Sequence, residues 1–210
     1  MRVDRLGEGA AILRDVPRDP VEVASSLEAA SLPGLIEAVA CYDTVGVYFD
    51  ASFDLDSLEV VAASPSAPGR ERRHTIPVCY EYGEDLESVS KALGLSAEEV
   101  VRLHAAGEYR CFAVGFCPGF PYLGYLPDAL SGLPRLRTPR QRVARGSVAV
   151  TGRQTGVYPL PRPGGWSILG RTPVVLVDVE DRFFPIRAGD IVRFLPIEED
   201  EFRAREGERL

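Results

Sequence analysis

Lysine, histidine and long apolar runs are scarce in this chain of 210 residues, and each shortage excludes a class of protein. Lysine occurs once, at Lys91, so the chain has no Gly-x-x-x-x-Gly-Lys-Ser/Thr loop of the kind that binds nucleotide phosphates. With two histidines, and four cysteines that lack Cys-x-x-Cys spacing, no metal site is expected. No apolar run approaches the roughly 18–20 residues that cross a membrane, and charges interrupt the N-terminal residues, where a signal peptide would be apolar. The sequence therefore predicts a soluble, cytoplasmic protein.

Three of the four cysteines, Cys41, Cys79 and Cys111, lie in apolar stretches typical of strands, where a reduced thiol behaves as a small hydrophobic group. Cys117 lies in a loop rich in glycine and proline, so we considered it as a nucleophile. That role requires a histidine base beside the thiol, and the neighbouring residues are phenylalanine and proline. A cysteine nucleophile is therefore not expected.

The formal net charge of −7 argues against a general nucleic-acid-binding protein. Almost every positive charge is an arginine, and five of the arginines crowd into a short segment, at positions 135, 137, 140, 142 and 145. Arginine is always charged and can bind a carboxylate or a phosphate through two parallel hydrogen bonds. Two interpretations stay open. The segment is either a solvated basic edge or docking patch for an acidic partner, or a site for a small anion.

The N-terminal part of the chain alternates strand and helix patterns. Asp19-Pro20 precedes a segment with apolar residues on one helical face, and Pro33-Gly34 ends it. The order strand, helix, strand, strand, helix, strand predicts a small α/β domain over residues 1–82, with a mixed or antiparallel sheet. We expect a hairpin within 1–14, strands at 35–41, 44–49 and 74–80, helices at 21–30 and 55–62, and a Pro/Ser/Gly hinge at 64–69.

Two helices are predicted next, at 85–93 and 97–106. Ser96 and Glu99 have the spacing of a capping box, in which each side chain satisfies the other residue's free backbone amide. Gly94 stands just beyond the first helix, where a left-handed cap is needed.

Beyond these helices the helical period disappears, and short β runs alternate with Gly/Pro turns, which predicts a β-sandwich or barrel. We therefore predict an α+β fold whose second domain covers 83–200 and is followed by an acidic, frayed tail at 201–210. The expected strands are 109–114, 147–151, 156–158, 166–169, 173–179, 183–187 and 190–195.

The stretch 114–173 combines Gly, Pro and aromatic residues, so it predicts rigid, shaped loops, where sites usually lie. Three blocks of sequence stand out within this stretch. The first is Gly-Phe-Cys-Pro-Gly-Phe-Pro-Tyr-Leu-Gly at 115–124, and the second is Thr-Pro-Arg-Gln-Arg-Val-Ala-Arg-Gly-Ser-Val at 138–148. The third, within 152–173, consists of Gly-Arg-Gln-Thr-Gly-Val-Tyr-Pro followed by Pro-Gly-Gly-Trp-Ser-Ile-Leu-Gly-Arg-Thr-Pro. In this order and spacing they resemble the family of KipI and the 5-oxoprolinase subunit PxpB, also called allophanate hydrolase subunit 1. The same domain forms half of the carboxyltransferase region of urea carboxylase.

The sequence departs from that family's pattern at three places. Ala144 and Arg145 stand where the family usually has Pro-Ala. Arg162 replaces a serine, and Tyr125 replaces a second glycine after Leu-Gly. Two of these changes add an arginine beside the expected site, so they bear on the substrate more than on the fold.

The resemblance implies a cyclophilin-like β-barrel behind the N-terminal domain. It also implies partners: a PxpC/KipA-like subunit with a similar barrel, and a PxpA-like third subunit. The family's 5-oxoprolinase uses ATP to open the lactam ring of 5-oxoproline and gives glutamate. A lactam is a poor electrophile, and ATP, bound with magnesium by the complex, would activate it by phosphorylating the carbonyl oxygen. Such a step depends on positioning and on neutralisation of charge.

Three residues are candidates for catalysis. Arg140 could contact an anion, since Pro139 stiffens its loop, or could form a surface ion pair with the acidic tail. Gln154 lies between two nearby glycines, and its amide could bind the N–H and C=O groups of a lactam. His104, near the end of a helix, could act as a general acid–base or could simply stabilise the helix C-terminus.

A second group of residues is expected to bind substrate or nucleotide. Its aromatic members could form a ligand-facing wall, a subunit interface or ordinary barrel core. Its glycines would contact a ligand through their backbone amides. The group consists of Phe116, Pro118, Phe120, Tyr122, Thr155, Tyr158, Gly164, Gly165, Trp166, Arg171 and Thr172.

Two other functions compete with that of a 5-oxoprolinase subunit. A KipI-like inhibitor of a sporulation histidine kinase would need a recognition surface but no complete pocket. A carboxyltransferase half related to urea carboxylase or allophanate metabolism would act with biotin carboxylase and biotin carrier regions, whose features are not found in this sequence. The motifs favour an enzyme subunit that is inactive without its partner.

Overall fold

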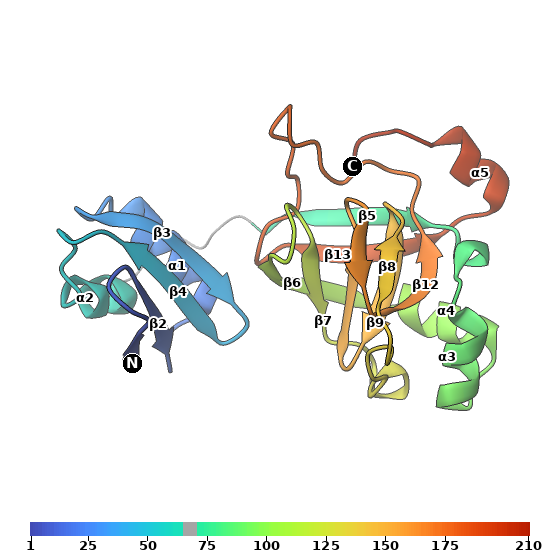
Figure 1. Ribbon diagram of the computed structural model, residues 1–210, viewed down its shortest axis with the longest axis horizontal. Coiled ribbons are helices and arrows are strands. Elements are labelled where there is room, and N and C mark those ends of the chain that lie inside the picture. Colours follow the sequence, from blue (N-terminus) through green and yellow to red (C-terminus); the bar gives the residue numbers. More distant parts are fainter. Residues whose placement is uncertain (65–70) are drawn as a thin grey trace. The chain divides into compact units, whose positions relative to one another are not determined.

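The computed structural model describes residues 1–64 and 71–210, which form two compact units, Met1–Glu71 and Arg72–Leu210 (Figure 1). Each unit has a sheet and a hydrophobic core of its own. Apart from Ser64, the hinge predicted at 64–69 lies outside the described residues. In the described part of the chain, no helix is long and apolar enough to cross a membrane.

The first unit is a four-stranded antiparallel sheet, in the order β1-β2-β4-β3, with two helices. Its first helix begins as predicted, because the Asp19 carboxylate accepts the Val21 backbone N–H at 2.9 Å and Pro20 takes the first helical position. Val23 and Leu27 on this helix are fully buried. The elements are β1 (Arg2–Arg5), β2 (Ala10–Arg14), α1 (Pro20–Ala29), β3 (Leu35–Cys41), β4 (Thr44–Phe49) and α2 (Ser57–Ala63).

The second unit is built on a seven-stranded sheet that nearly closes into a barrel (Figure 1), so the predicted fold class is confirmed. The strand order is β12-β9-β10-β7-β6-β13-β5. The two edge strands meet where Cys79, just after β5, and Arg171, at the end of β12, exchange two backbone hydrogen bonds of 2.9 Å. The strands are β5 (Arg73–Val78), β6 (Glu108–Val114), β7 (Pro121–Gly124), β9 (Ser147–Thr151), β10 (Gln154–Val157), β12 (Ser167–Arg171) and β13 (Ile191–Pro196).

Two helices, α3 (Leu86–Leu93) and α4 (Ala97–Ala105), pack on the barrel and add Val89 and Val100 to its core. The predicted capping box is confirmed: Glu99 donates its backbone N–H to the Ser96 hydroxyl at 3.2 Å, and Ser96 donates its own to the Glu99 carboxylate at 2.8 Å. Short 3-10 turns, η1 (Tyr80–Tyr82) and η2 (Asp128–Leu130), complete the connections.

A two-stranded ribbon of β8 (Arg140–Val143) and β11 (Arg162–Gly164) is separate from the seven-stranded sheet. It contributes to a second apolar cluster, distinct from the barrel core. The cluster consists of Cys117, Phe120, Val143, Ala149, Tyr158, Trp166 and Ile168, with Tyr122 packed against it. The loops that stood out in the sequence therefore build a small core of their own.

Two predictions about strands are wrong. The strand expected to complete the N-terminal domain is β5, which instead pairs in parallel with β13 in the barrel, so the units divide after Glu71 and not after residue 82. Its partner lies more than a hundred residues later in the chain, and no local pattern records so distant a pairing. The segments 173–179 and 183–187, expected to be strands, make only isolated bridges such as the one between Asp178 and Phe183.

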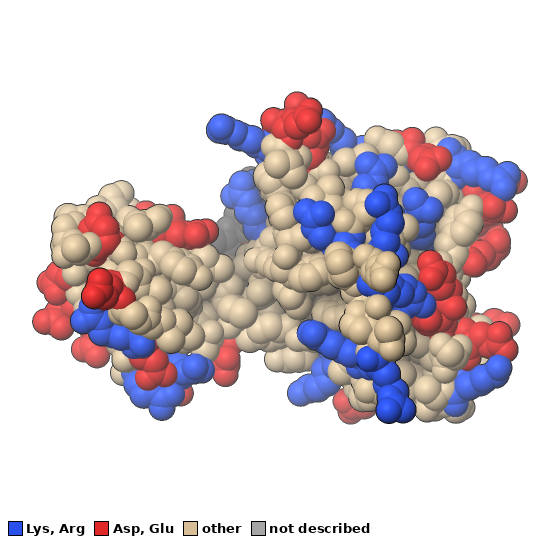
Figure 2. Space-filling view, in the orientation of Figure 1, with Lys and Arg blue, Asp and Glu red and all other residues tan. Residues whose placement is uncertain are grey.

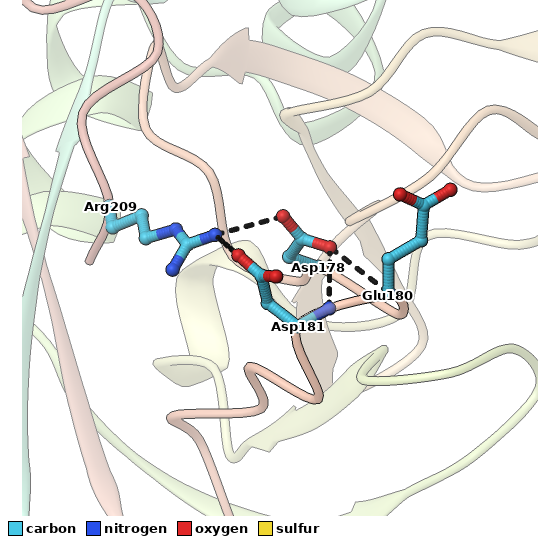
Figure 3. Close-up of polar contacts among 4 residues, drawn as sticks. All are labelled: Asp178, Glu180, Asp181 and Arg209. Atoms are coloured by element: carbon cyan, nitrogen blue, oxygen red, sulfur yellow. Dashed lines mark hydrogen bonds and ion pairs between the residues drawn. The ribbon is translucent and has the colours of Figure 1, made fainter.

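The C-terminal residues are ordered structure, which corrects the prediction of a frayed tail. Helix α5 (Glu199–Ala204) buries Phe202 beside Cys79 and Ile197. Further on, the Arg209 guanidinium binds the carboxylates of Asp178, at 2.9 Å, and Asp181 (Figure 3). Phe202, an aromatic residue within an acidic segment, is the local sequence feature that accompanies the packing of α5 against the second unit.

Candidate functional site

A pocket of about 340 Å³ opens on the second unit where three segments meet, two of them from the sequence blocks described above. These segments are the η1–α3 connection, the turn between β8 and β9, and the end of β12. The lining residues are Glu81, Tyr82, Gly83, Glu84, Ala144, Ser147 and Arg171. Both acidic and basic groups therefore border the space.

Two glycines allow the walls of this pocket to approach each other. A Cβ atom on Gly83 would lie 2.2 Å from the Leu169 carbonyl oxygen. At Gly146 the φ angle is +82°, and a Cβ would lie 2.4 Å from the carbonyl oxygen of Thr172. Neither position accepts a side chain, so the backbone itself sets the shape of the pocket.

Arg171 is the cation of the pocket. Its Nε donates a hydrogen bond to the Arg145 carbonyl oxygen at 3.1 Å, and its guanidinium lies 5.8 Å from the Phe202 ring centroid. Among residues 1–64 and 71–210, no carboxylate lies within ion-pair distance of it, and none of the described groups hydrogen-bonds the hydroxyl of neighbouring Ser147. The pocket therefore offers a guanidinium and a hydroxyl as donors to a ligand.

The ordered C-terminus supports the pocket from behind. The Tyr82 hydroxyl donates to the Glu199 carboxylate at 2.7 Å, and its ring packs edge-on against Phe202 with centroids 4.9 Å apart. The hydrogen bond to Glu199 also raises the pKa of the Tyr82 phenol. Helix α5 thus holds two pocket residues, Tyr82 and Arg171.

Arg140, predicted to contact an anion in catalysis, is already engaged by the chain's own carboxylates. Its Nη2 lies 2.7 Å from Asp85 and its Nε 3.3 Å from Glu84, and the Asp85 hydrogen bond raises the pKa of Arg140. The other Asp85 oxygen accepts the Ile168 backbone N–H at 2.7 Å. Arg140 therefore positions Glu84 at the pocket edge, while its Nη1 is buried without a hydrogen-bond partner in the described part of the chain.

His104, the second residue predicted to be catalytic, lies inside the protein with no exposed surface. Its Nδ1 is 2.7 Å from the Tyr80 hydroxyl and its Nε2 is 2.9 Å from the Thr155 hydroxyl, which itself donates to the Ala149 carbonyl oxygen at 3.1 Å. Because the Thr155 hydroxyl proton is donated to Ala149, the Thr155 oxygen accepts a hydrogen bond from Nε2–H of His104. Nδ1 is then unprotonated and accepts a hydrogen bond from the Tyr80 hydroxyl. Burial lowers the pKa of His104 to about 3, so the ring is neutral.

This burial corrects the roles expected for His104 and Thr155. The polar atoms of both side chains are hydrogen-bonded inside the protein, and neither side chain reaches a surface where a ligand could bind. The imidazole also stacks on Phe194, with ring centroids 4.6 Å apart. The position suits a structural histidine and does not suit a general acid–base.

Gln154, the third residue predicted to be catalytic, is distant from the pocket. It pairs with Thr151 at one end of β9, whereas Ser147 begins the other end of that strand and pairs with Arg171. Four steps along the strand, at about 3.4 Å each, separate the two ends by about 14 Å. The fold therefore does not bring Gln154 and Arg171 to one site.

Four of the eleven residues predicted to bind substrate belong to the second apolar cluster or pack against it: Phe120, Tyr158, Trp166 and Tyr122. Phe120, Tyr158 and Trp166 are buried and pack edge to face, with centroids 5.1–5.4 Å apart. Gly164 makes room for this packing, since a Cβ there would lie 2.2 Å from the Tyr158 hydroxyl. Tyr122 and Gly165 are partly exposed, Phe116 and Pro118 are exposed, and Thr172 is buried behind the pocket.

Sequence reasoning found Arg171 and missed the groups around it. Ser147 was visible as the end of Arg-Gly-Ser in the second block, one residue after a glycine. Glu84 and Tyr82 carried no such signal, because their contribution depends on the pairing of Cys79 with Arg171.

Residues 7–184 match the family described as carboxyltransferase domain, subdomain C and D. The chain belongs to this family. The B subunit of 5-oxoprolinase from Bacillus subtilis (strain 168) is 34% identical over 97% of this chain and 95% of its own length. The protein of the same name from Escherichia coli O157:H7 is 39% identical over 92% of this chain and 95% of its own. The resemblance to the PxpB family is thereby confirmed.

Solved structures agree with the fold. TTHA0988 superimposes with a TM-score of 0.81 at 40% identity over 90% of this chain, which corresponds to 40% of that longer protein. The urea carboxylase of Kluyveromyces lactis superimposes with a TM-score of 0.71 at 16% identity, over 96% of this chain and 22% of its own length. At that identity the urea carboxylase supports the fold alone.

Proposed function

We propose that this chain is the B-type subunit of an ATP-dependent 5-oxoprolinase, which opens 5-oxoproline to glutamate together with PxpC/KipA-like and PxpA-like subunits. Relatives named as the B subunit of 5-oxoprolinase, at 34% and 39% identity over nearly the whole chain, support the assignment. The observation that supports a substrate site in this chain is that the Arg171 guanidinium lies in the pocket and has no carboxylate partner among the described residues.

A carboxylated lactam suits the groups of this pocket. Arg171 would bind the carboxylate of 5-oxoproline through two parallel hydrogen bonds, and the Ser147 hydroxyl would donate to it. The Glu84 carboxylate, held by Arg140, would accept the lactam N–H. Binding in this orientation would leave the lactam carbonyl free for chemistry completed by the partner subunits.

The triphosphate of ATP does not suit the same pocket. Glu81 and Glu84 line it, and one unpaired arginine cannot neutralise a triphosphate beside two carboxylates. We therefore assign to this chain the binding of the lactam, and we assign ATP and its magnesium ion to another part of the complex.

Reconstitution with the cognate subunits tests the proposal. We expect ATP hydrolysis that depends on 5-oxoproline, with one glutamate released for each ATP hydrolysed, and no activity from this chain alone. A stable complex whose ATP hydrolysis ignores 5-oxoproline would contradict the proposal and would favour a regulatory role or a carboxyltransferase-related one.

A further inference from the structure

The charge of this chain is strongly segregated. Between residues 129 and 177 the sequence has eight arginines and no aspartate or glutamate, although the whole chain has a net charge of −7. In the space-filling view, Lys and Arg side chains gather over the region where the ribbon diagram draws β8 and β12 (Figure 2). A soluble surface usually mixes the two signs, so a segment of this length whose only charged side chains are arginines is unusual.

Five of the arginines are exposed on or beside the β8–β11 ribbon. None of them lies within ion-pair distance of a carboxylate in the described ranges 1–64 and 71–210. Their charges repel one another and are left for an external partner to neutralise. The five are Arg135, Arg137, Arg142, Arg145 and Arg162.

A large apolar side chain projects beside these charges. Phe116 is 58% exposed and has a φ angle of +68°, which is costly for a bulky residue. Its ring meets Phe120 and Tyr158 edge-on, with centroids 5.4 and 6.2 Å away. The loop is also held at Gly119, where a Cβ would lie 2.1 Å from Val177. The fold therefore presents Phe116 in a fixed position.

Phe116 and the arginines form one surface. Arg162 pairs with Val143 across the β8–β11 ribbon, and Val143 packs in one apolar cluster with Cys117, the residue after Phe116. The Leu136 backbone N–H donates to the Gly165 carbonyl oxygen at 2.7 Å, which places the neighbouring Arg135 beside the end of β11. An exposed aromatic ring together with exposed arginines is the composition typical of protein–protein hot spots.

We propose that Phe116 and the five exposed arginines form a docking surface for the partner subunit of the complex. The partner would present an apolar pocket for Phe116, bordered by carboxylates that pair with Arg135, Arg142 and Arg162. A nucleic acid is a poorer match, because the chain as a whole is acidic and one phenylalanine offers no stacking platform. This surface adjoins the lactam pocket at Arg145, whose carbonyl oxygen accepts a hydrogen bond from Arg171, and the inference rests on the proposed role as a subunit.

Charge reversal tests the docking surface. The triple variant Arg135→Glu, Arg142→Glu and Arg162→Glu is compared with a control that reverses three exposed arginines elsewhere, Arg5, Arg102 and Arg187. Binding to the separately expressed PxpC/KipA-like subunit is measured by titration at low and moderate salt. We expect the triple variant to weaken binding by about 100-fold or more and Phe116→Ser by about 30-fold. The control, with the same net charge, should bind like the native chain.

Each outcome has a defined meaning. If the triple variant binds like the control, the docking surface is overturned and the proposed function stands. If the native chain forms no complex with this subunit, both proposals fail. If the native chain binds single-stranded DNA tightly and the triple variant does not, the surface is a nucleic-acid site and the docking proposal is overturned. Circular dichroism of all variants excludes unfolding as the cause.

Discussion

His104 and Arg171 lie in the same unit, and both looked like functional residues in the sequence. Inside the barrel, the two ring nitrogens of His104 are satisfied by Tyr80 and Thr155. At the pocket, the guanidinium of Arg171 keeps donors for which the described residues supply no carboxylate. A polar group that the protein satisfies completely stabilises the fold, whereas one that it leaves open is available to a ligand. Variants at the two places should therefore affect different properties.

The largest effect on stability is expected inside the barrel. His104→Ala removes a buried ring and leaves the hydroxyls of Tyr80 and Thr155 without their partner, so the free energy of unfolding should fall by about 3–5 kcal/mol. Trp166, the only tryptophan, reports urea unfolding of the second unit by fluorescence. Arg102→Ala on the exposed side of the same helix is the control. A loss below about 1 kcal/mol would mean that the buried network contributes little.

The ion pair behind the pocket should come next. Asp85→Ala removes the closer and more buried of the two carboxylates that pair with Arg140 and leaves the Ile168 N–H without its acceptor, which should cost about 3 kcal/mol. The double variant with Arg140→Met should recover part of that loss, since the partly buried guanidinium is removed and the Glu84 carboxylate that it leaves is exposed to water. Urea unfolding of the two single variants and the double variant measures the coupling. Strict additivity would contradict a direct interaction.

The pH dependence of stability should carry the signature of His104. Its pKa is about 3 in the folded chain and 6.5 unperturbed, so between these values only the unfolded state binds a proton. The free energy of unfolding should therefore decrease by about 1.4 kcal/mol for each pH unit as the pH falls through this window. Subtracting the profile of His104→Gln removes the contribution of the carboxylates. Identical slopes for the two proteins would show that the histidine is not buried as a neutral ring.

The smallest effect on stability is expected at the pocket. Arg171→Gln should change the free energy of unfolding by less than about 1 kcal/mol, because its guanidinium has no internal ion pair in the described structure. Thermal unfolding of the native and variant chains provides the comparison. A large destabilisation would place Arg171 with His104 among the structural residues.

Local patterns in the sequence were reliable where the deciding contacts are local. Asp19-Pro20 and the capping box of Ser96 and Glu99 each involve residues within three positions of one another, and both helices begin where expected. Pairings between distant segments decided the rest. The parallel pairing of β5 with β13 and the bridge between Cys79 and Arg171 create the domain boundary and the pocket, and neither has a local signature.

The catalytic roles predicted for His104 and Arg140 do not fit the structure for a related reason. A histidine on an amphipathic helix is compatible with an active site and with a core, and only its burial beside Tyr80 decides between them. Arg140 could not be recognised as paired, because Asp85 and Glu84 lie more than fifty residues earlier. Arg171 was identified from its motif, but the absence of a carboxylate partner became visible only in the described structure.

The central claim is that Arg171 binds the carboxylate of a lactam substrate, and a comparison of two ligands tests it directly. The reconstituted complex is assayed with 5-oxoproline and with 2-pyrrolidinone, the same lactam without its carboxylate, in the native form, in Arg171→Gln and in Arg102→Gln, a control at an exposed arginine outside the pocket and the docking surface. We expect the native and Arg102→Gln complexes to prefer 5-oxoproline, and we expect Arg171→Gln to lower the ratio of kcat/KM for the two lactams by about 10- to 100-fold. If Arg171→Gln discriminates between the two lactams as well as the native complex does, the carboxylate binds elsewhere and the account of the pocket is wrong.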